Sequence, residues 1–529
     1  MSLLKSITTF GGFTLISRFT GFARDMVIAN FLGAGMVSDA FFVSFKLPNL
    51  FRSLFAEGAF TAAFVPMLSG KLVSEGKDKA VLFASRAISV LAFFLLLFVI
   101  LMEFLMPWVV EVLAPGFAGD EGKIELATNL CRITFPFLLF ISIVSFQSGI
   151  LNSLNKFAAP ACAPIILNFT VISAAFLLGN IGPTRAHGLA CGITLAGILE
   201  IFWLRYFIRK QGITIKPQYH IASLLKLEDI ITLFRRIAPG VLGAGVYQIN
   251  MVVDTILVSL VGTGAISWLY YANRLQQLPL GVVGAAISVA LLPILSKALK
   301  NANQTEAERT QDKAVEYGAL LSIPAAVALI VLAHPIINIL FERGRFTAQD
   351  SYLTSLAVAA YSLGLPAYVL VKALTPNFFA RGDTKTPVKY SIVVLVTNLV
   401  CSLILMRPLG HLGIALATSI AAYVSLYQYI HGLKKRRHWQ FSRSLTIQLG
   451  KIIFCSFLMG GILSLLQYGI FKAGIQWLNY HLLVKTAILG GLGILGVASF
   501  LIFAKLTGAL NISDLLKLIK RRGKSNAAS

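Results

Sequence analysis

The stretch TTFGGFTLISRFTGFARDMVIANFLG, residues 8–33, is long and apolar enough to span a membrane as a helix. It nevertheless carries Arg18 and Arg24, and the following apolar stretch carries Arg52. An arginine at the centre of a bilayer costs roughly 2.5–3.5 kcal/mol. These three side chains are therefore expected to face a polar cavity rather than lipid, within a fold built of membrane-spanning helices.

The composition of the whole chain is typical of a polytopic membrane protein. Of its 529 residues, 57% are hydrophobic and 13% are charged, and the mean hydropathy is +0.79. The five cysteines lie in apolar segments without CxxC spacing, which favours buried small side chains over disulfides or metal ligands.

Apolar runs of spanning length predict an all-α fold with about 14 transmembrane helices. The runs cover residues 8–33, 37–66, 80–106, 128–151, 159–180, 187–208, 237–261, 266–295, 314–333, 351–378, 388–406, 412–432, 450–471 and 483–504. Lysines and arginines gather in every second connection and in the tail, which places both termini in the cytoplasm by the positive-inside rule. Membrane topology thus accounts for the net charge of +24, and nucleic acid is not an expected partner.

The two halves of the chain repeat. The segment AFVPMLS at 63–69 recurs as ALLPILS at 290–296, and Gly188-Leu189-Ala190 recurs as Gly413-Ile414-Ala415. Each copy holds an even number of spans, so the copies insert in parallel, related by an axis along the membrane normal. We therefore predict an N-terminal lobe at 1–215 (spans 1–6), a C-terminal lobe at 216–440 (spans 7–12), and spans 13–14 with a basic cytoplasmic tail at 441–529.

Charged residues of the second span fall on one helical stripe. Asp39, Lys46 and Glu57 are 7 and 11 residues apart, within about 20° of one another at 100° per residue. Arg52 lies off this stripe on an ideal helix, but a kink at Pro48 would redirect it.

Guanidinium groups match phosphate oxygens in pairs, so the arginines favour an anionic, phosphorylated substrate. The second lobe contributes Arg274, which closes the predicted headgroup site from the other side. The alternative is that the cations only form structural ion pairs with Asp25, Asp39 and Glu57. The cations Arg18, Arg24, Lys46 and Arg52 outnumber these three acids.

No motif for nucleotide hydrolysis, metalloprotease or serine-hydrolase chemistry stands on a connection that could fold around it. The longest connections hold about 20–25 residues. The sequence therefore predicts a transporter rather than an enzyme.

Motifs within residues 17–66 resemble the N-terminal signature of the MurJ/MviN lipid II flippase family. This family is part of the multidrug/oligosaccharidyl-lipid/polysaccharide exporter superfamily. The resemblance is carried by Ser17-Arg18, Gly21-Phe22-Ala23-Arg24-Asp25, Gly33-Ala34-Gly35, Ser38-Asp39-Ala40-Phe41-Phe42, Phe45-Lys46-Leu47-Pro48-Asn49-Leu50, Phe55-Ala56-Glu57-Gly58-Ala59-Phe60 and Phe64-Val65-Pro66. The layout of spans extends it over essentially the whole chain. It implies two six-helix lobes plus two C-terminal helices.

The resemblance also implies a function: movement of undecaprenyl-diphosphate-linked disaccharide-pentapeptide, lipid II, from the cytoplasmic to the outer leaflet by alternating access. The cavity charges of the family match Arg18, Arg24, Asp39, Arg52 and Arg274 here, with Asp25, Lys46 and Glu57 nearby. Expected partners are lipid II, membrane lipids and cell-wall synthesis proteins, in the bacterial cytoplasmic (inner) membrane.

No cofactor is expected except a sodium ion, which some members of the family bind in the second lobe. Asp254, Asn377, Val393 and Thr397 are similar to that site. This chain departs from the pattern at Arg381, where a carboxylate is expected, so a guanidinium could take the place of the cation.

Two other functions remain open from the sequence. A cation-coupled drug exporter of the same superfamily should have a net acidic cavity, contrary to the excess of arginine here. A polyprenyl-phosphate transferase should have catalytic carboxylates near a polar surface, and the acidic connection at 107–127 is the only candidate.

Overall fold

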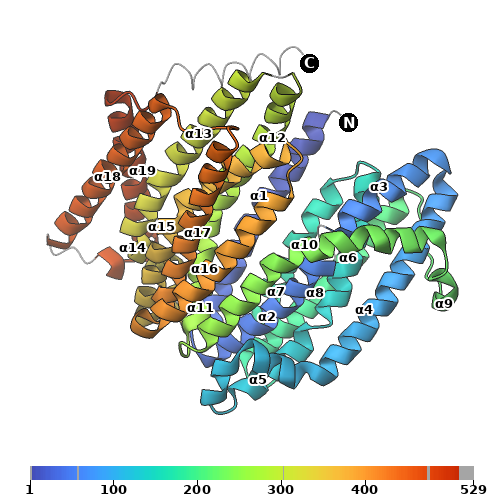
Figure 1. Ribbon diagram of the computed structural model, residues 1–529. Helices are drawn as coiled ribbons and strands as arrows, with labels where there is room; N and C mark the ends of the chain where they lie inside the picture. The colour runs from blue at the N-terminus through green and yellow to red at the C-terminus, as the bar shows by residue number, and fades with distance from the viewer. Residues whose placement is uncertain (1–2, 56–58, 302, 473–476, 511–529) are drawn as a thin grey trace. The chain divides into compact units, whose positions relative to one another are not determined.

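The computed structural model describes residues 3–55, 59–301, 303–472 and 477–510. Every regular element within these ranges is helical, so the predicted all-α class is confirmed (Figure 1). The first half contains α1 (Leu3–Leu32), α2 (Met36–Phe55), α3 (Ala59–Ser74), α4 (Lys77–Leu113), η1 (Pro115–Gly119), α5 (Lys123–Thr134), α6 (Phe137–Ser153), α7 (Ala158–Leu177), α8 (Arg185–Lys210), α9 (Ile221–Leu224) and α10 (Glu228–Ser259).

The remainder of the chain continues in the same way. It contains α11 (Ala265–Pro279), η2 (Leu280–Gly284), α12 (Ala285–Lys300), α13 (Gln304–Val331), α14 (Ala333–Phe341), α15 (Ala348–Phe379), α16 (Lys385–Leu409), α17 (His411–Lys435), α18 (Arg443–Lys472), η3 (Trp477–Asn479) and α19 (Leu482–Leu506). Each predicted apolar run overlaps one of these helices or consecutive ones, and some helices extend up to about ten residues beyond the run.

Ten helices of the described residues are long and apolar enough to cross a membrane. The predicted count of about 14 therefore stays a prediction. Prolines interrupt the helices of two predicted runs, one of which, within Lys123–Ser153, is still among the ten. Pro136 separates α5 from α6, and Pro279 ends α11 before the π-helical turn η2, because proline cannot donate the backbone hydrogen bond that continues a helix.

The chain forms two compact units. The first unit contains Met1–Ser267 and Arg343–Asp350, and the second contains Trp268–Glu342 and Ser351–Ser529. These boundaries differ from the lobes that the repeat predicts, because α10 packs against α2, α3 and α4 of the first half. The lobes at 1–215 and 216–440 and the C-terminal segment at 441–529 remain predictions about the repeat.

Each unit has its own apolar core. In the first unit, the ring of Phe64 is fully buried against Phe60, Phe83 and Phe146, with centroids 5.2, 5.9 and 4.4 Å away. In the second unit, α13, α18 and α19 lie side by side (Figure 1). Their core includes Trp439, which is 1% exposed.

The repeat is visible in two helical hairpins, α7–α8 and α16–α17. A Cβ on Gly188 would lie 2.1 Å from the carbonyl oxygen of Leu178, and one on Gly413 would lie 2.2 Å from that of Leu405. Both glycines thus let the start of one helix approach the end of the helix before it. The repeated motif, Gly188-Leu189-Ala190 and Gly413-Ile414-Ala415, therefore marks the same close approach between helices in both halves.

We expect Gly188→Ala and Gly413→Ala each to lower stability, because the added methyl group would overlap a backbone oxygen that cannot rotate away. Overpacking of this kind costs about 1–3 kcal/mol. Thermal unfolding of the purified protein in detergent measures the effect. Gly491→Ala in α19 is the matched control, since a Cβ there meets nothing within 4 Å. Unfolding temperatures equal to wild type at both positions would contradict the prediction.

Candidate functional site

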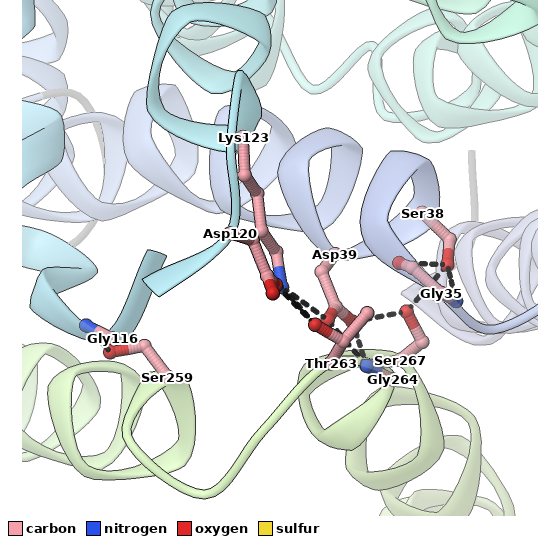
Figure 2. Close-up of polar contacts among 10 residues, drawn as sticks. All are labelled: Gly35, Ser38, Asp39, Gly116, Asp120, Lys123, Ser259, Thr263, Gly264 and Ser267. Carbon is pink, nitrogen blue, oxygen red and sulfur yellow. Dashed lines mark hydrogen bonds and ion pairs between the residues drawn. The ribbon is translucent and has the colours of Figure 1, made fainter. Parts of the chain in front are cut away.

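Asp39, in the first turn of α2, is the most extensively bonded of the predicted site residues (Figure 2). Its carboxylate is fully buried and accepts hydrogen bonds from the backbone N–H of Gly264 at 2.7 Å and of Ser267 at 3.0 Å. The Ser267 hydroxyl donates a third, at 2.7 Å. Gly264 precedes α11 and has no side chain that could cap it. Asp39 therefore acts as the N-terminal cap of a helix more than 200 residues away in sequence.

Lys123 completes this cluster from the start of α5. Lys123 is 1% exposed, and its ammonium group donates to Asp120 at 3.0 Å, to the Thr263 hydroxyl at 3.0 Å and to Asp39 at 3.4 Å. It also lies 4.4 Å from the centre of the Phe117 ring. Three separate chain segments thus meet at one lysine, as Figure 2 shows.

Asp120, in the connection before α5, has a side chain that is 42% exposed. The hydroxyl of Thr263 and the ammonium group of Lys123 both donate to it. These two hydrogen bonds hold the pKa of the Asp120 carboxyl below its usual value. We call Asp39, Asp120, Lys123, Thr263, Gly264 and Ser267 the Asp39 cluster.

Arg24 and Asp25 form an ion pair in the interior of the first unit. Arg24 is 4% exposed and its Nη2 lies 2.7 Å from Asp25 Oδ1. Its Nη1 donates to Asn168 of α7 at 3.1 Å, and its guanidinium group lies 5.1 Å from the centre of the Phe45 ring. The Asn168 amide in turn donates to the carbonyl oxygen of Ser17 at 3.0 Å. Arg24 is thus held in place by three groups, the Asp25 carboxylate, the Asn168 amide and the Phe45 ring.

The other predicted residues of the first unit have fewer described contacts. Arg18 is exposed on α1, and Arg52 is partly buried on α2 with its Nε donating to Asn49 at 3.1 Å. Lys46 is partly buried within the electrostatic reach of Asp39 and Asp254. Glu57 lies outside the described residues.

Arg274 belongs to the second unit. It lies on α11, where its Nη2 donates to the Tyr270 hydroxyl at 2.9 Å and its guanidinium group lies 5.1 Å from the centre of that ring. Whether Arg274 shares a cavity with the arginines of the first unit stays a prediction.

The residues of the predicted sodium set divide between the units. Asp254 lies on α10 in the first unit, where it accepts from Asn250 at 3.2 Å. Asn377, Val393 and Thr397 lie in the second unit. Asn377 is 1% exposed, whereas the Val393 side chain is 44% exposed and Thr397 is partly buried.

Arg381 donates a hydrogen bond to the side-chain oxygen of Asn377, which a cation at this position would need as a ligand. Arg381 Nε donates to Asn377 Oδ1 at 3.1 Å, and Nη2 donates to Gln304 at 3.2 Å. The Asn377 amide group donates to Gln311 at 3.2 Å. A sodium ion at Asn377 would compete for Oδ1 with the guanidinium group that donates to it, so the sodium site stays a prediction. The described residues also hold no group of three or more His, Cys, Asp or Glu side chains that could bind a metal.

The sequence pattern missed two residues that the structure connects to the predicted site, Lys123 and Asn168, and one buried acid, Glu200. Lys123 lies in a connection between apolar runs, although its spacing of three from Asp120 at a helix start is a usable signal. Asn168 matches Asn398 in the repeat but carries no charge. Glu200 lies in the middle of an apolar run and is 1% exposed.

Comparisons with known proteins agree on one family. The family model of lipid II flippase MurJ matches residues 28–481. A probable lipid II flippase MurJ of Rhizobium tropici is 39% identical over 531 residues, covering 99% of this chain and 97% of that protein.

Solved structures give the same result. The structure of a lipid II flippase MurJ in an inward closed conformation matches with a TM-score of 0.77 and 29% identity, over 94% of this chain and 98% of that one. A multidrug MATE transporter in an inward-facing conformation matches with a TM-score of 0.65 and 15% identity, over 82% of this chain and 98% of that one, which shows a shared fold. The chain belongs to the lipid II flippase MurJ family.

Proposed function

We propose that this chain moves lipid II from one leaflet of the membrane to the other. It is a multi-pass membrane transporter and not an enzyme. The observation that carries the proposal is the family match, which extends over residues 28–481. The arginines inside α1 and α2 provide the chemistry that a diphosphate-linked lipid requires.

Arg24 is the residue best prepared to bind the diphosphate. A diphosphate loses its hydration shell when it crosses the membrane, and paired N–H donors of guanidinium groups replace those lost hydrogen bonds. The Asp25 and Asn168 contacts fix the Arg24 side chain before the lipid arrives, which reduces the entropy lost on binding. Arg18, Arg52 and Arg274 are proposed to bind the same headgroup, with Lys46 and Glu57 nearby.

The two alternatives are less well supported. A cation-coupled drug exporter would need an acidic cavity, whereas the candidate site is rich in arginine. For a transferase, the acidic connection between α4 and α5 was the candidate surface. Its Asp120 carboxyl is engaged by Lys123 and Thr263, so it is not poised as a base.

The basic connections favour an orientation with both termini in the cytoplasm, in the bacterial inner membrane. The Asp39 cluster then lies at the outer end of the helices. Alternating access requires this end to open, and opening requires Asp39 to release the first turn of α11. Partners beyond lipid II and membrane lipids, such as cell-wall synthesis proteins, remain an expectation.

We further propose that transport does not use sodium. Arg381 supplies a fixed positive charge at Asn377, and Asp254 is within the electrostatic reach of Lys46. Membrane potential would instead act directly on the charged site.

Arg24→Ala should abolish complementation of a flippase-depleted strain and reduce lipid II movement in proteoliposomes by at least about tenfold, since a hydrogen bond to a charged group contributes about 1.5–3 kcal/mol. Arg24→Lys should fail as well, because one ammonium group cannot reproduce the fork that reaches both Asp25 and Asn168. The exposed Arg443→Ala serves as the control. Normal growth with Arg24→Ala would argue against the site.

Release of the Asp39 cluster should expose the buried first turn of α11. Ala265→Cys, placed at a fully buried position in a chain without its native cysteines, should react slowly with a membrane-impermeant thiol reagent added to intact cells. Combining it with Asp39→Ala should speed the reaction by about tenfold or more, since the charge-assisted bonds to Gly264 and Ser267 are lost. The variants are expressed in cells that also carry the wild-type gene, so that growth does not depend on the activity of the variant. Equal labelling rates would refute a closing role for Asp39.

Replacing sodium by potassium on both sides of proteoliposomes should leave the rate of lipid II movement unchanged, while collapsing the membrane potential should reduce it. Potassium-only vesicles with an imposed potential separate the two effects. A rate that requires sodium, and loses that requirement in Asn377→Ala, would show that the cation site operates despite Arg381.

A further inference from the structure

Arg185 and Arg345 are two exposed arginines that meet the last turn of α1 from different parts of the chain. Arg185 is the first residue of α8, and its guanidinium group lies 4.9 Å from the centre of the Phe31 ring. Arg345 lies in the connection between α14 and α15, and its backbone N–H donates to the Asn30 carbonyl oxygen at 3.0 Å. The two arginines are thus anchored to adjacent residues of α1, close to its end at Leu32.

Arginines are unusual at this end of the molecule. With both termini in the cytoplasm, as proposed above, α1 ends at the outer surface, whereas lysine and arginine gather on the cytoplasmic side. Lys123, also at the outer end, lies in ion pairs with Asp39 and Asp120. Neither Arg185 nor Arg345 has an ion pair with any residue that the structure describes. Two cations without acidic partners point to an anionic ligand.

The contact with Phe31 prepares Arg185 to bind a phosphate group. A guanidinium group is planar and carries five N–H donors around its edge, and an aromatic ring holds it without using those donors. The Phe31 ring is itself supported by the Phe176 ring of α7, whose centroid lies 5.1 Å away. The donors of Arg185 are therefore positioned and available, and such donors match phosphate oxygens in pairs.

Exposed apolar side chains lie beside this cationic group. At the end of α7, Phe176 and Leu177 are 65% and 80% exposed, and Ile181 in the connection to α8 is 49% exposed. In a membrane-spanning chain, side chains of this kind contact lipid. A basic group next to them can bind a lipid headgroup while the hydrocarbon chain of the lipid stays in the bilayer. The expected ligand is therefore a lipid with a phosphorylated headgroup.

The same face of α1 leads from this end back to Arg24. Arg24 and Phe31 are seven residues apart, which places them about 10 Å apart along the helix and within about 20° of one another around it. Helix α7 runs beside α1 over this distance, with Asn168 at Arg24 and Phe176 at Phe31. Arg185 therefore presents a second guanidinium group further out along the face that carries Arg24.

We propose that Arg185 and Arg345 form a second site for the lipid diphosphate, which receives the headgroup at the outer surface after it leaves Arg24. The inference rests on the proposed function. A diphosphate bound tightly at a single site leaves slowly, whereas two successive sites let it exchange one set of donors for the next. An outer-leaflet phospholipid also carries a phosphate group, and crosslinking distinguishes the two lipids.

The experiment identifies the lipid that lies beside Arg185. The full chain, with photoreactive benzoylphenylalanine in place of Ile181, is irradiated in proteoliposomes that contain phosphatidylglycerol and a polyprenyl-diphosphate-linked disaccharide-pentapeptide. Mass spectrometry then identifies the attached lipid. We expect the diphosphate lipid. Combining Arg185→Ala with Arg345→Ala should lower its crosslinking yield by about tenfold or more, because charge-assisted hydrogen bonds are lost.

Arg407→Ala is the matched control and should keep the full crosslinking yield. Arg407 is an exposed arginine of the α16–α17 hairpin, which corresponds in the repeat to the α7–α8 hairpin. No aromatic ring of the described residues lies against its guanidinium group. Should the double variant fail to fold, Arg185→Gln removes the guanidinium group alone and gives the same comparison.

Crosslinks to the diphosphate lipid that decrease in the double variant and persist in Arg407→Ala support the proposal. A protein that transports the diphosphate lipid but crosslinks only to phosphatidylglycerol, or to neither lipid, overturns it. A yield that the double variant leaves unchanged also overturns it, as does an equal loss in Arg407→Ala. Vesicles in which the protein without the photoreactive residue moves no diphosphate lipid would instead overturn the proposed function.

Discussion

A charged group inside a membrane protein is stable only when a neighbouring group compensates its charge, and this constraint shapes the first unit of the structure. Asp25 compensates Arg24, and Lys123 with two backbone amides compensates Asp39. Lys123 comes from α5, the two amides come from the start of α11, and Asn168 of α7 also binds Arg24. The polar contacts therefore also fix how α1, α2, α5 and α7 pack, so the residues proposed to bind substrate are part of what holds these helices together.

Glycines add a second kind of contact, because the absence of a side chain lets two backbone segments approach closely. Gly188 and Gly413 allow equivalent hairpins in the two halves, and Gly33 and Gly344 allow a third approach in the first unit. A Cβ on Gly344 would lie 2.3 Å from the Asn30 carbonyl oxygen, and one on Gly33 would lie 2.4 Å from that of Arg345. Both have positive φ angles, of 68° for Gly33 and 59° for Gly344. The connection between α14 and α15 is thereby held against the end of α1.

The sequence predicted the helices well because hydrophobic length and helix breakers act locally. The apolar runs correspond to observed helices, and breaks fall at Pro136 and Pro279. It could not predict that α10 packs with the first-half helices, because one apolar helix face resembles another. It also could not pair Arg24 with Asn168 or Asp39 with Ser267, since such pairs depend on packing between distant segments. Charge counting identified which residues needed partners, but not which partners they have.

The position of Asp39 has one more consequence. It lies in the first turn of α2 and also caps the first turn of α11, so the amino ends of two helices converge on a single carboxylate. Each of these ends carries about half a positive charge from the aligned peptide dipoles. The carboxylate therefore separates two ends that repel each other. Without the charge of Asp39, the repulsion between the two helix ends would no longer be offset. One acidic side chain therefore stabilises the closed contact between α2 and α11.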